Sequence, residues 1–234
     1  MIEDLFTQYF FEVWERLSPS DSDLDINRQP RYLQLLALVA FHAFIRENVR
    51  AAIFETHHGG EFDTTNVIQG PVVTAITSLG MDHIAQLGPT IEDIAWHKAG
   101  IFKPGAPAFS APQELGPAAV LRKRAAEKGV ELTFVPTNTS LPATAKVLGI
   151  SVQKVNCSLA LALTNAFLQR TSPGNEMSPD DVHRGVTNFS WPGRFEALED
   201  GNSMWYLDGA HNGLSVKQAA EWFAKNVNVS KEQR

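Results

Sequence analysis

The sequence contains a single cysteine, Cys157, among its 234 residues. One thiol cannot form a disulfide within the chain or supply a cysteine zinc cluster. A long hydrophobic run is also missing, because the densest apolar stretch, Tyr32–Ile45, is interrupted by Gln34 and His42; this argues against a membrane-spanning helix. There is no long basic run, and 20 basic residues against 26 acidic ones give a net charge of −6. These features argue against a surface that tracks nucleic-acid phosphates.

The sequence also lacks a targeting segment at its start. Met-Ile-Glu-Asp is acidic and carries neither a basic n-region nor an Arg-rich transit peptide. The lone cysteine is compatible with a reducing compartment. We therefore expect a cytoplasmic protein, and a mitochondrial form stays open because Met1 need not begin the complete protein.

Helical and strand patterns divide the first part of the chain. Apolar residues recur at helical spacing in Phe6–Leu17 and Tyr32–Asn48, which predicts two amphipathic helices. The polar stretch Ser18–Pro30 between them is typical of a loop. Ala51–Glu55 and Val72–Ser78 are apolar runs without alternation, which predicts strands buried on both faces.

The middle of the chain alternates between helix and strand patterns. A helix is predicted at Thr90–Ala99, with Thr90 as N-cap and Gly100 as C-cap. The elements expected after it are a strand at Pro107–Ala111, a helix at Gly116–Lys128, a strand at Glu131–Val135 and a long helix at Val155–Arg170. This alternation predicts an α/β fold with a mostly parallel sheet flanked by helices.

A different composition begins after the polar connection Thr171–Asp181. One strand, Met204–Asp208, and one helix, Ser215–Asn226, precede a polar tail, Ser230–Arg234. Such a pair cannot bury a core of its own. We therefore expect one domain at residues 1–187 and, at residues 188–234, the first β/α unit of a second α/β domain.

The turn that follows Ala51–Glu55 concentrates glycine, histidine and acidic residues. Glu55 ends a predicted buried strand, where a carboxylate is costly unless it is paired or binds a metal; binding to loop amides is an equally good interpretation. For His57 and His58, packing or hydrogen bonding within the loop is the simpler role. The glycines at 59 and 60 permit unusual backbone angles, and Asp63 and Asn66 are expected to brace the loop through side-chain to backbone bonds.

Further polar clusters stand at the ends of other predicted elements. His83, beside Asp82, is either structural or a metal ligand that a neighbouring carboxylate orients. Lys98 lies near a helix end, where a cation is favourable on dipole grounds alone. Arg194 follows a Pro-Gly turn that could aim its guanidinium at a phosphate. The cluster Asp208–Asn212 opens a helix. Ligands bind at the carboxyl ends of parallel strands, so a site that handles phosphate and metal is the first hypothesis.

These motifs, in this order, resemble the folylpolyglutamate synthases of the Mur-type ATP-dependent amide ligases. The segments that carry the resemblance are Phe6–Glu12, Glu55–Asn66, Ile76–His83, Ile94–Pro104, Trp191–Glu196 and Trp205–Asn212. The resemblance implies an incomplete P-loop-type central ATPase domain, followed by the start of a glutamate ligase domain.

The resemblance also implies roles for individual residues. Glu55 and His83 match magnesium ligands, and Lys98 matches a lysine that carbon dioxide converts to a carbamate. Asn156 matches a contact to ATP. Arg194 and Asp208 match residues that the second domain brings to the ATP, and His211 and Asn212 match contacts in the same loop.

The implied reaction adds L-glutamate to folate or tetrahydrofolate through a γ-linked amide bond. ATP would phosphorylate the folate γ-carboxylate, and the glutamate amine would then attack the acyl phosphate. Magnesium is the implied metal, with a monovalent cation as a further candidate, and the implied protein acts as a monomer.

The sequence departs from the family pattern at several points. Thr56 and His57 replace glycines found in many members, and Val152 stands where histidine is usual. No Gly-x-x-x-x-Gly-Lys-[Ser/Thr] loop, which would cradle the ATP phosphates, occurs in the chain. In the family that loop precedes the segment that matches Met1.

We therefore expect the resemblance to cover a protein shortened at both ends, and this chain by itself to be inactive. A catalytically inactive remnant that binds folate or a partner chain is the second hypothesis. A third is a metal-dependent hydrolase that uses Glu55, His57, Asp82 and His83.

Overall fold

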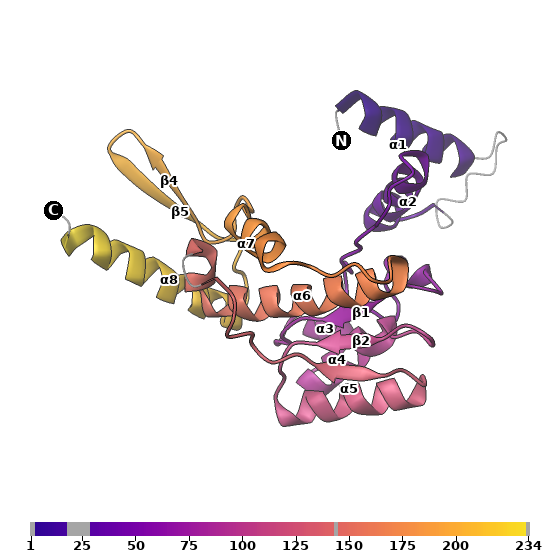
Figure 1. Cartoon of the computed structure of the whole chain (residues 1–234). Helices are drawn as coiled ribbons and strands as arrows, with labels where there is room; N and C mark the ends of the chain where they lie inside the picture. Colours follow the sequence, from indigo (N-terminus) through magenta and orange to yellow (C-terminus); the bar gives the residue numbers. More distant parts are fainter. Residues whose placement is uncertain (1–2, 18–28, 143–144, 233–234) are drawn as a thin grey trace. The chain divides into compact units, whose positions relative to one another are not determined.

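The computed structural model of the chain describes residues 3–17, 29–142 and 145–232 (Figure 1). These residues form two compact units, one up to Ile68 and one from Gln69 onward, which are described separately. Most of the predicted loop Ser18–Pro30 lies outside the described residues. The domain boundary predicted between residues 187 and 188 stays a prediction.

The first unit contains two helices at the predicted places. Helix α1 spans Glu3–Leu17 and helix α2 spans Tyr32–Arg46. Apolar side chains of the two helices form a small shared core, whose buried members are Tyr9, Leu35, Val39 and Ala43. A short 3-10 helix, η2 (Thr64–Val67), closes the polar turn of this unit.

The strand predicted at Ala51–Glu55 is absent, so this prediction is wrong for the described structure. The segment has irregular backbone, and the side chain of Ile53 is 92% exposed. An apolar run becomes a strand only when a neighbouring strand accepts and donates its backbone hydrogen bonds. Among the described residues, none pairs with Ala51–Glu55 in a sheet.

The second unit is built on a three-stranded parallel sheet in the order β1-β2-β3. The strands are β1 (Thr74–Ile76), β2 (Ala108–Ser110) and β3 (Leu132–Phe134). All three lie within predicted strands, and Thr74 pairs with Ala108. Figure 1 shows α6 on one side of this sheet and α5 on the other. The predicted α/β fold, with a parallel sheet flanked by helices, is confirmed.

Helices α3 (Ile84–Leu87), α4 (Ile91–Lys98) and α5 (Leu115–Glu127) connect these strands. Thr90 caps α4 as predicted, since its hydroxyl accepts a hydrogen bond from the Asp93 N–H at 3.1 Å. Gly100 does not end the helix as predicted, because the chain tightens into the 3-10 helix η3 (Ala99–Ile101). The buried core between sheet and helices consists of Ile76, Ala95, Ala99, Phe102, Ala108, Leu121, Ala125 and Val130.

Two helices follow the sheet. After the 3-10 helix η4 (Lys146–Gly149), helix α6 spans Ser151–Thr171 and α7 spans Pro179–Thr187. Sequence reasoning missed α7, although Ser178 and Asp181 form a capping box at its start. Leu148 and Val186 belong to the small core that these elements share.

The last segment is a hairpin followed by a helix. Strand β4 (Glu196–Asp200) pairs antiparallel with β5 (Ser203–Leu207), and α8 spans Gly213–Glu232. The prediction of a single strand was wrong, because β4 was overlooked. Gly201, with φ +58°, stands in the two-residue loop of the hairpin, and a Gly-Asn pair is a recognised signal for such a loop. Helix α8 also includes most of the predicted polar tail.

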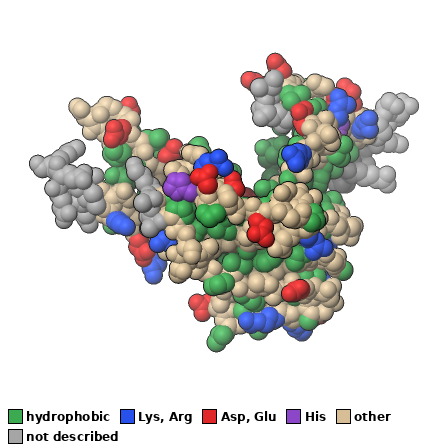
Figure 2. Space-filling view, in the orientation of Figure 1, with side chains coloured by type: hydrophobic (Ala, Val, Ile, Leu, Met, Phe, Trp, Pro, Cys, Tyr) green, Lys and Arg blue, Asp and Glu red, His purple; other side chains and the backbone are tan. Residues whose placement is uncertain are grey.

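The surface in Figure 2 carries acidic and basic side chains interspersed with exposed hydrophobic ones. On that face the described lysines and arginines are dispersed. None of the helices in the described part of the chain is both long and apolar enough to cross a membrane.

Candidate functional site

The polar turn of the first unit is organised by the carboxylate of Asp63. It accepts hydrogen bonds from the backbone N–H of His58 at 2.7 Å and from the N–H of Thr65 at 2.9 Å. The Thr65 hydroxyl donates a third bond at 2.6 Å. Burial by itself would raise the pKa of Asp63, but these hydrogen bonds bring the pKa below its usual value. The predicted brace by Asp63 is therefore confirmed, and Asn66 contributes by donating to the Glu61 carbonyl at 3.1 Å.

Glu55 precedes this turn on irregular, exposed backbone. It lies in the first unit, whereas His83 and the other predicted site residues lie in the second. Its pairing with His83 at one magnesium ion therefore stays a prediction. The premise that Glu55 ends a buried strand is corrected by the structure.

In the second unit, the loop after β1 presents Asp82 and His83. His83 adopts a left-handed conformation, with φ +52°, immediately before α3. Few residues other than glycine take these angles, and when they do the neighbouring structure must hold them. Asp82 supplies one such restraint, since its Oδ1 accepts a hydrogen bond from the His83 N–H at 2.8 Å. The His83 side chain is 45% exposed.

The turn between β5 and α8 is organised by Asn212 and Ser215. Asn212 precedes the first residue of α8, and its Oδ1 accepts a hydrogen bond from the Ser215 N–H at 3.0 Å. The Ser215 hydroxyl in turn accepts a bond from the Asn212 N–H at 3.1 Å. This reciprocal pattern caps the helix and leaves the amide nitrogen of Asn212 able to reach a group outside the turn.

Asp82 joins these two loops. Its Oδ2 accepts a hydrogen bond from Nδ2 of Asn212 at 3.2 Å and lies 3.3 Å from Nε2 of His211. Burial alone would raise the pKa of Asp82, but the bonds from Asn212 and His83 and the nearby imidazoles hold it below its usual value. A hydrogen bond to the Gly209 carbonyl and the charge of Asp82 raise the pKa of His211.

Asp208 and Arg194 stand beside this junction. The carboxylate of Asp208 accepts hydrogen bonds from the backbone N–H groups of Phe195 at 2.9 Å and Ala210 at 2.8 Å. It thus ties the turn before β4 to the turn after β5. The Arg194 guanidinium lies against Gly209, where a Cβ atom would overlap with it. Any other residue at position 209 would force the exposed Arg194 side chain to move.

The structure therefore brings five of the predicted residues into one region of the second unit. They are His83, Arg194, Asp208, His211 and Asn212. Lys98 is the half-buried last residue of α4, and Asn156 is half-buried in α6.

Sequence reasoning missed a second brace of the loop after β1. Gln113 donates from Nε2 to the Thr77 carbonyl at 2.8 Å and accepts at Oε1 from the Leu79 N–H at 3.0 Å. It also donates to the hydroxyl of Ser110, which is fully buried. The two partners lie 34 and 36 residues away from Gln113 in the sequence, so no local pattern could have revealed this clamp.

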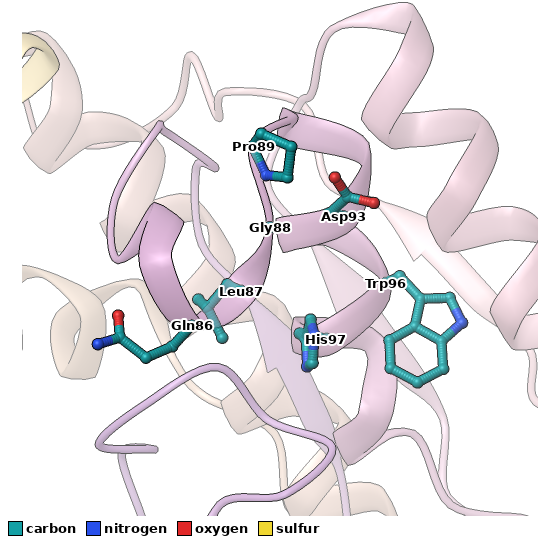
Figure 3. A pocket seen from close by; sticks show the side chains of 7 residues that line it. All are labelled: Gln86, Leu87, Gly88, Pro89, Asp93, Trp96 and His97. Atoms are coloured by element: carbon teal, nitrogen blue, oxygen red, sulfur yellow. The ribbon is translucent and has the colours of Figure 1, made fainter.

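A pocket of about 300 Å³ opens between α3 and α4 (Figure 3). It is lined by Gln86, Leu87, Gly88, Pro89, Asp93, Trp96 and His97. The Arg124 guanidinium lies 4.4 Å from the centre of a Trp96 ring, a cation–π distance. None of the predicted site residues lines this pocket, although Lys98 directly follows His97.

The metal hypothesis can be compared with the donors present. In the described part of the chain, no group of three or more His, Cys, Asp or Glu side chains could hold a metal ion. Mg²⁺ prefers oxygen ligands and keeps several waters, so it binds few protein groups. The accessible imidazole of His83 fits such an ion only if water and substrate phosphate oxygens complete its shell.

Comparisons with known proteins place these features in a family context. No protein-family model matches the chain. It is 41% identical over 231 residues to the folylpolyglutamate synthase of Neurospora crassa, covering 95% of this chain and 44% of that protein. It is 39% identical over 250 residues to the folylpolyglutamate synthase of Saccharomyces cerevisiae strain FostersO, covering 99% of this chain and 45% of that protein. The chain therefore spans about half the length of the curated relatives that it matches.

Solved structures agree in fold. The folylpolyglutamate synthase of Mycobacterium tuberculosis complexed with ADP and AMPPCP matches with a TM-score of 0.80 at 24% identity, covering 96% of this chain and 55% of that one. A folylpolyglutamate synthase in complex with AMPPCP and folate matches with a TM-score of 0.79 at 23% identity, covering 95% and 57%. These structures share the fold, and the curated relatives confirm the resemblance to folylpolyglutamate synthases that the sequence motifs indicate.

Proposed function

Because the chain is homologous to folylpolyglutamate synthases over nearly its whole length, we propose that it provides part of a site that adds L-glutamate to folate at the expense of ATP. A γ-carboxylate oxygen of folate attacks the γ-phosphorus of ATP, and ADP leaves. The glutamate amine then attacks the acyl carbon, a C–N bond forms, and phosphate and a proton are released. The observation that carries this proposal is the junction of the His83 loop with the Asp208–Asn212 turn.

The residues of this junction suit a phosphorylated ligand. Arg194 carries a planar guanidinium that can bind phosphate oxygens through two N–H groups. Asp208 is held by two backbone N–H groups, which fixes its free lone pairs for the ribose or a bound cation of ATP. His211, whose pKa is raised, would add positive charge beside a bound phosphate when protonated, while its ring nitrogens stay bonded to Gly209 and Asp82. Asn156 is proposed to contact the nucleotide from α6.

Lys98 is proposed to act as a carbamate. Its neutral amine would add to the carbon of carbon dioxide, a C–N bond would form and a proton would be lost. The product carries a negative oxygen pair where the lysine carried a positive charge. Such a group can accept hydrogen bonds from the waters of a hard cation or from the substrate amine. The support for this role is the place of Lys98 in the Ile94–Pro104 motif, at the end of α4.

Magnesium is proposed to bind at His83, with Glu55 of the first unit as a second ligand. When bound, it would offset charge on the phosphoryl oxygens during transfer. Arg194 would share that task from the other loop.

Hydroxylamine trapping tests the acyl phosphate. The longest in-frame chain that the gene encodes is incubated with folate, ATP, magnesium and hydroxylamine, but without glutamate. The proposal predicts a folate γ-hydroxamate and one ADP for each hydroxamate formed. ADP release without hydroxamate would contradict the acyl phosphate.

Substitution of Lys98 tests the carbamate. Lys98→Ala should lower glutamate incorporation by at least roughly 100-fold, within the range of losses seen when one charge-stabilising group is removed. A short carboxylate added to the assay should restore part of the rate. Lys123→Ala on α5, where the lysine side chain is exposed, serves as the matched control. A near-normal rate for Lys98→Ala would remove the carbamate assignment.

A further inference from the structure

Asp82 has no role in the reaction proposed above, yet it makes more contacts across this region than any other carboxylate described there. Its Oδ1 accepts from the His83 N–H at 2.8 Å. Its Oδ2 accepts from Asn212 at 3.2 Å and lies 3.3 Å from the His211 imidazole. The side chain is 32% exposed, so these contacts are partly shielded from water.

We propose that Asp82 is a positioning residue that fixes the Asp208–Asn212 turn against the His83 loop. The bond to Asn212 joins positions 130 residues apart. Each end of this bond has a second local hydrogen bond: Asp82 also accepts from the His83 N–H, and Asn212 caps α8. A small movement of Asp82 would therefore move both loops relative to each other.

Apolar packing beside the carboxylate supports the same junction. A Cβ atom on Gly80 would lie 3.3 Å from a methyl carbon of Leu214, so the backbone before Asp82 already approaches the first turn of α8. A side chain at position 80 would require the exposed Leu214 side chain to shift slightly. The two loops therefore approach each other closely, and Asp82 joins them through directional hydrogen bonds.

The inference rests on the proposed function for its consequence. If Arg194 and His211 face the ATP phosphates from one side and His83 acts from the other, Asp82 holds the two sides at the spacing that the phosphate chain needs. A misplacement of about 1 Å can cost about 100-fold in rate. Asp82 itself would touch neither substrate nor the reacting atoms.

An exchange of amide and carboxylate tests the contact. Aspartate is as good an N-cap as asparagine and interacts favourably with a helix N-terminus, so Asn212→Asp by itself should not weaken α8. Opposite Asp82, however, it places two carboxylates about as close as the present 3.2 Å contact. Asp82→Asn combined with Asn212→Asp restores an amide facing a carboxylate.

Amide hydrogen exchange of the 234-residue chain is the first measurement. Exchange at residues 205–216 should rise about tenfold in Asn212→Asp and return most of the way to the wild-type rate in the double variant. Asp200→Asn, an exposed change at the hairpin tip, should leave these rates as they are. Unchanged exchange in Asn212→Asp, or a double variant as fast as Asn212→Asp, would overturn the proposal.

Steady-state kinetics of glutamate addition is the second measurement, on the longest in-frame chain. Asn212→Asp should lower kcat with a melting temperature close to that of the wild type, and the double variant should regain much of kcat. If kcat falls only where the melting temperature falls as well, Asp82 has a structural role only. If the wild type adds no glutamate, the proposed function fails, while the exchange measurement still decides whether Asp82 positions the turn.

Discussion

Two aspartates, Asp63 and Asp82, each organise a polar loop, and they do so over very different distances in the sequence. The partners of Asp63 lie two and five residues away. Asp82 bonds to its neighbour His83 and to Asn212, which is 130 residues away. In both cases the hydrogen bonds hold the pKa of the carboxyl group below its usual value, against the effect of burial. A hydrogen-bonded aspartate carboxylate can therefore shape one loop or join two loops, and the positions of its hydrogen-bond donors in the sequence decide which.

The largest loss of stability is expected from the local brace. Asp63→Ala leaves two backbone N–H groups and the Thr65 hydroxyl without their acceptor, in a turn where Asp63 is buried. The free energy of unfolding of the first unit should fall by about 2–3 kcal/mol. Urea denaturation measures this change. Asp63→Asn should lose less, because an amide oxygen can still accept from Thr65. Equal stability of the alanine variant and the wild type would show that the turn does not depend on Asp63.

A smaller loss is expected from the long-range clamp at Gln113. Gln113→Ala removes the partners of the Thr77 carbonyl and the Leu79 N–H. The Thr77 carbonyl and the Leu79 N–H lie in a partly exposed loop, where water can replace part of each lost hydrogen bond. We therefore expect the free energy of unfolding to fall by about 1–2 kcal/mol. Denaturation of the second unit is the measurement, with the exposed Gln86→Ala as control. If Gln113→Ala and Gln86→Ala have the same free energy of unfolding, Gln113 does not clamp this loop.

Asp82→Asn should change global stability least of these three substitutions. It keeps the size of the side chain, and its contacts are partly exposed, so a change of less than about 1 kcal/mol is expected. The contrast with Asp63→Ala separates a residue that stabilises a loop from one that positions two loops. If Asp82→Asn lowers the free energy of unfolding as much as Asp63→Ala does, Asp82 stabilises a loop just as Asp63 does.

The smallest effect concerns a third aspartate, Asp181, at the start of α7. Hydrogen bonds from Ser178 and Arg184 lower the pKa of its carboxyl to about 2. Because the folded pKa is depressed, its contribution to stability is present above the ordinary value near 3.8 and is lost as the pH falls through about 2. NMR titration of the side-chain carboxyl measures the pKa directly. Ser178→Ala should raise it, and a pKa near 3.8 in the wild type would contradict the capping box.

The same distinction between local and distant partners explains what the sequence could predict. Thr90 was identified as an N-cap and Asp63 as a brace because their partners lie within a few residues. The Gln113 clamp and the link from Asp82 to Asn212 were missed because no local pattern encodes them.

Strand predictions failed for a related reason. The apolar run Ala51–Glu55 has strand-like composition, but a strand exists only with a partner, and none of the described residues pairs with it. Strand β4 was overlooked although its partner β5 was predicted, since the residues Glu196–Asp200 are mostly polar and exposed. Pairing across the Gly201 turn, rather than composition, makes this segment a strand.

Glutamate incorporation into folate measures the proposed activity itself. The longest in-frame chain that contains these residues is supplied with folate, ATP, magnesium and labelled glutamate, beside the same chain without ATP. We expect γ-linked glutamyl folate, with one ADP and one phosphate released for each glutamate added and none without ATP. ATP hydrolysis that yields no glutamyl folate, or no turnover at all in the complete protein, would contradict the proposed function.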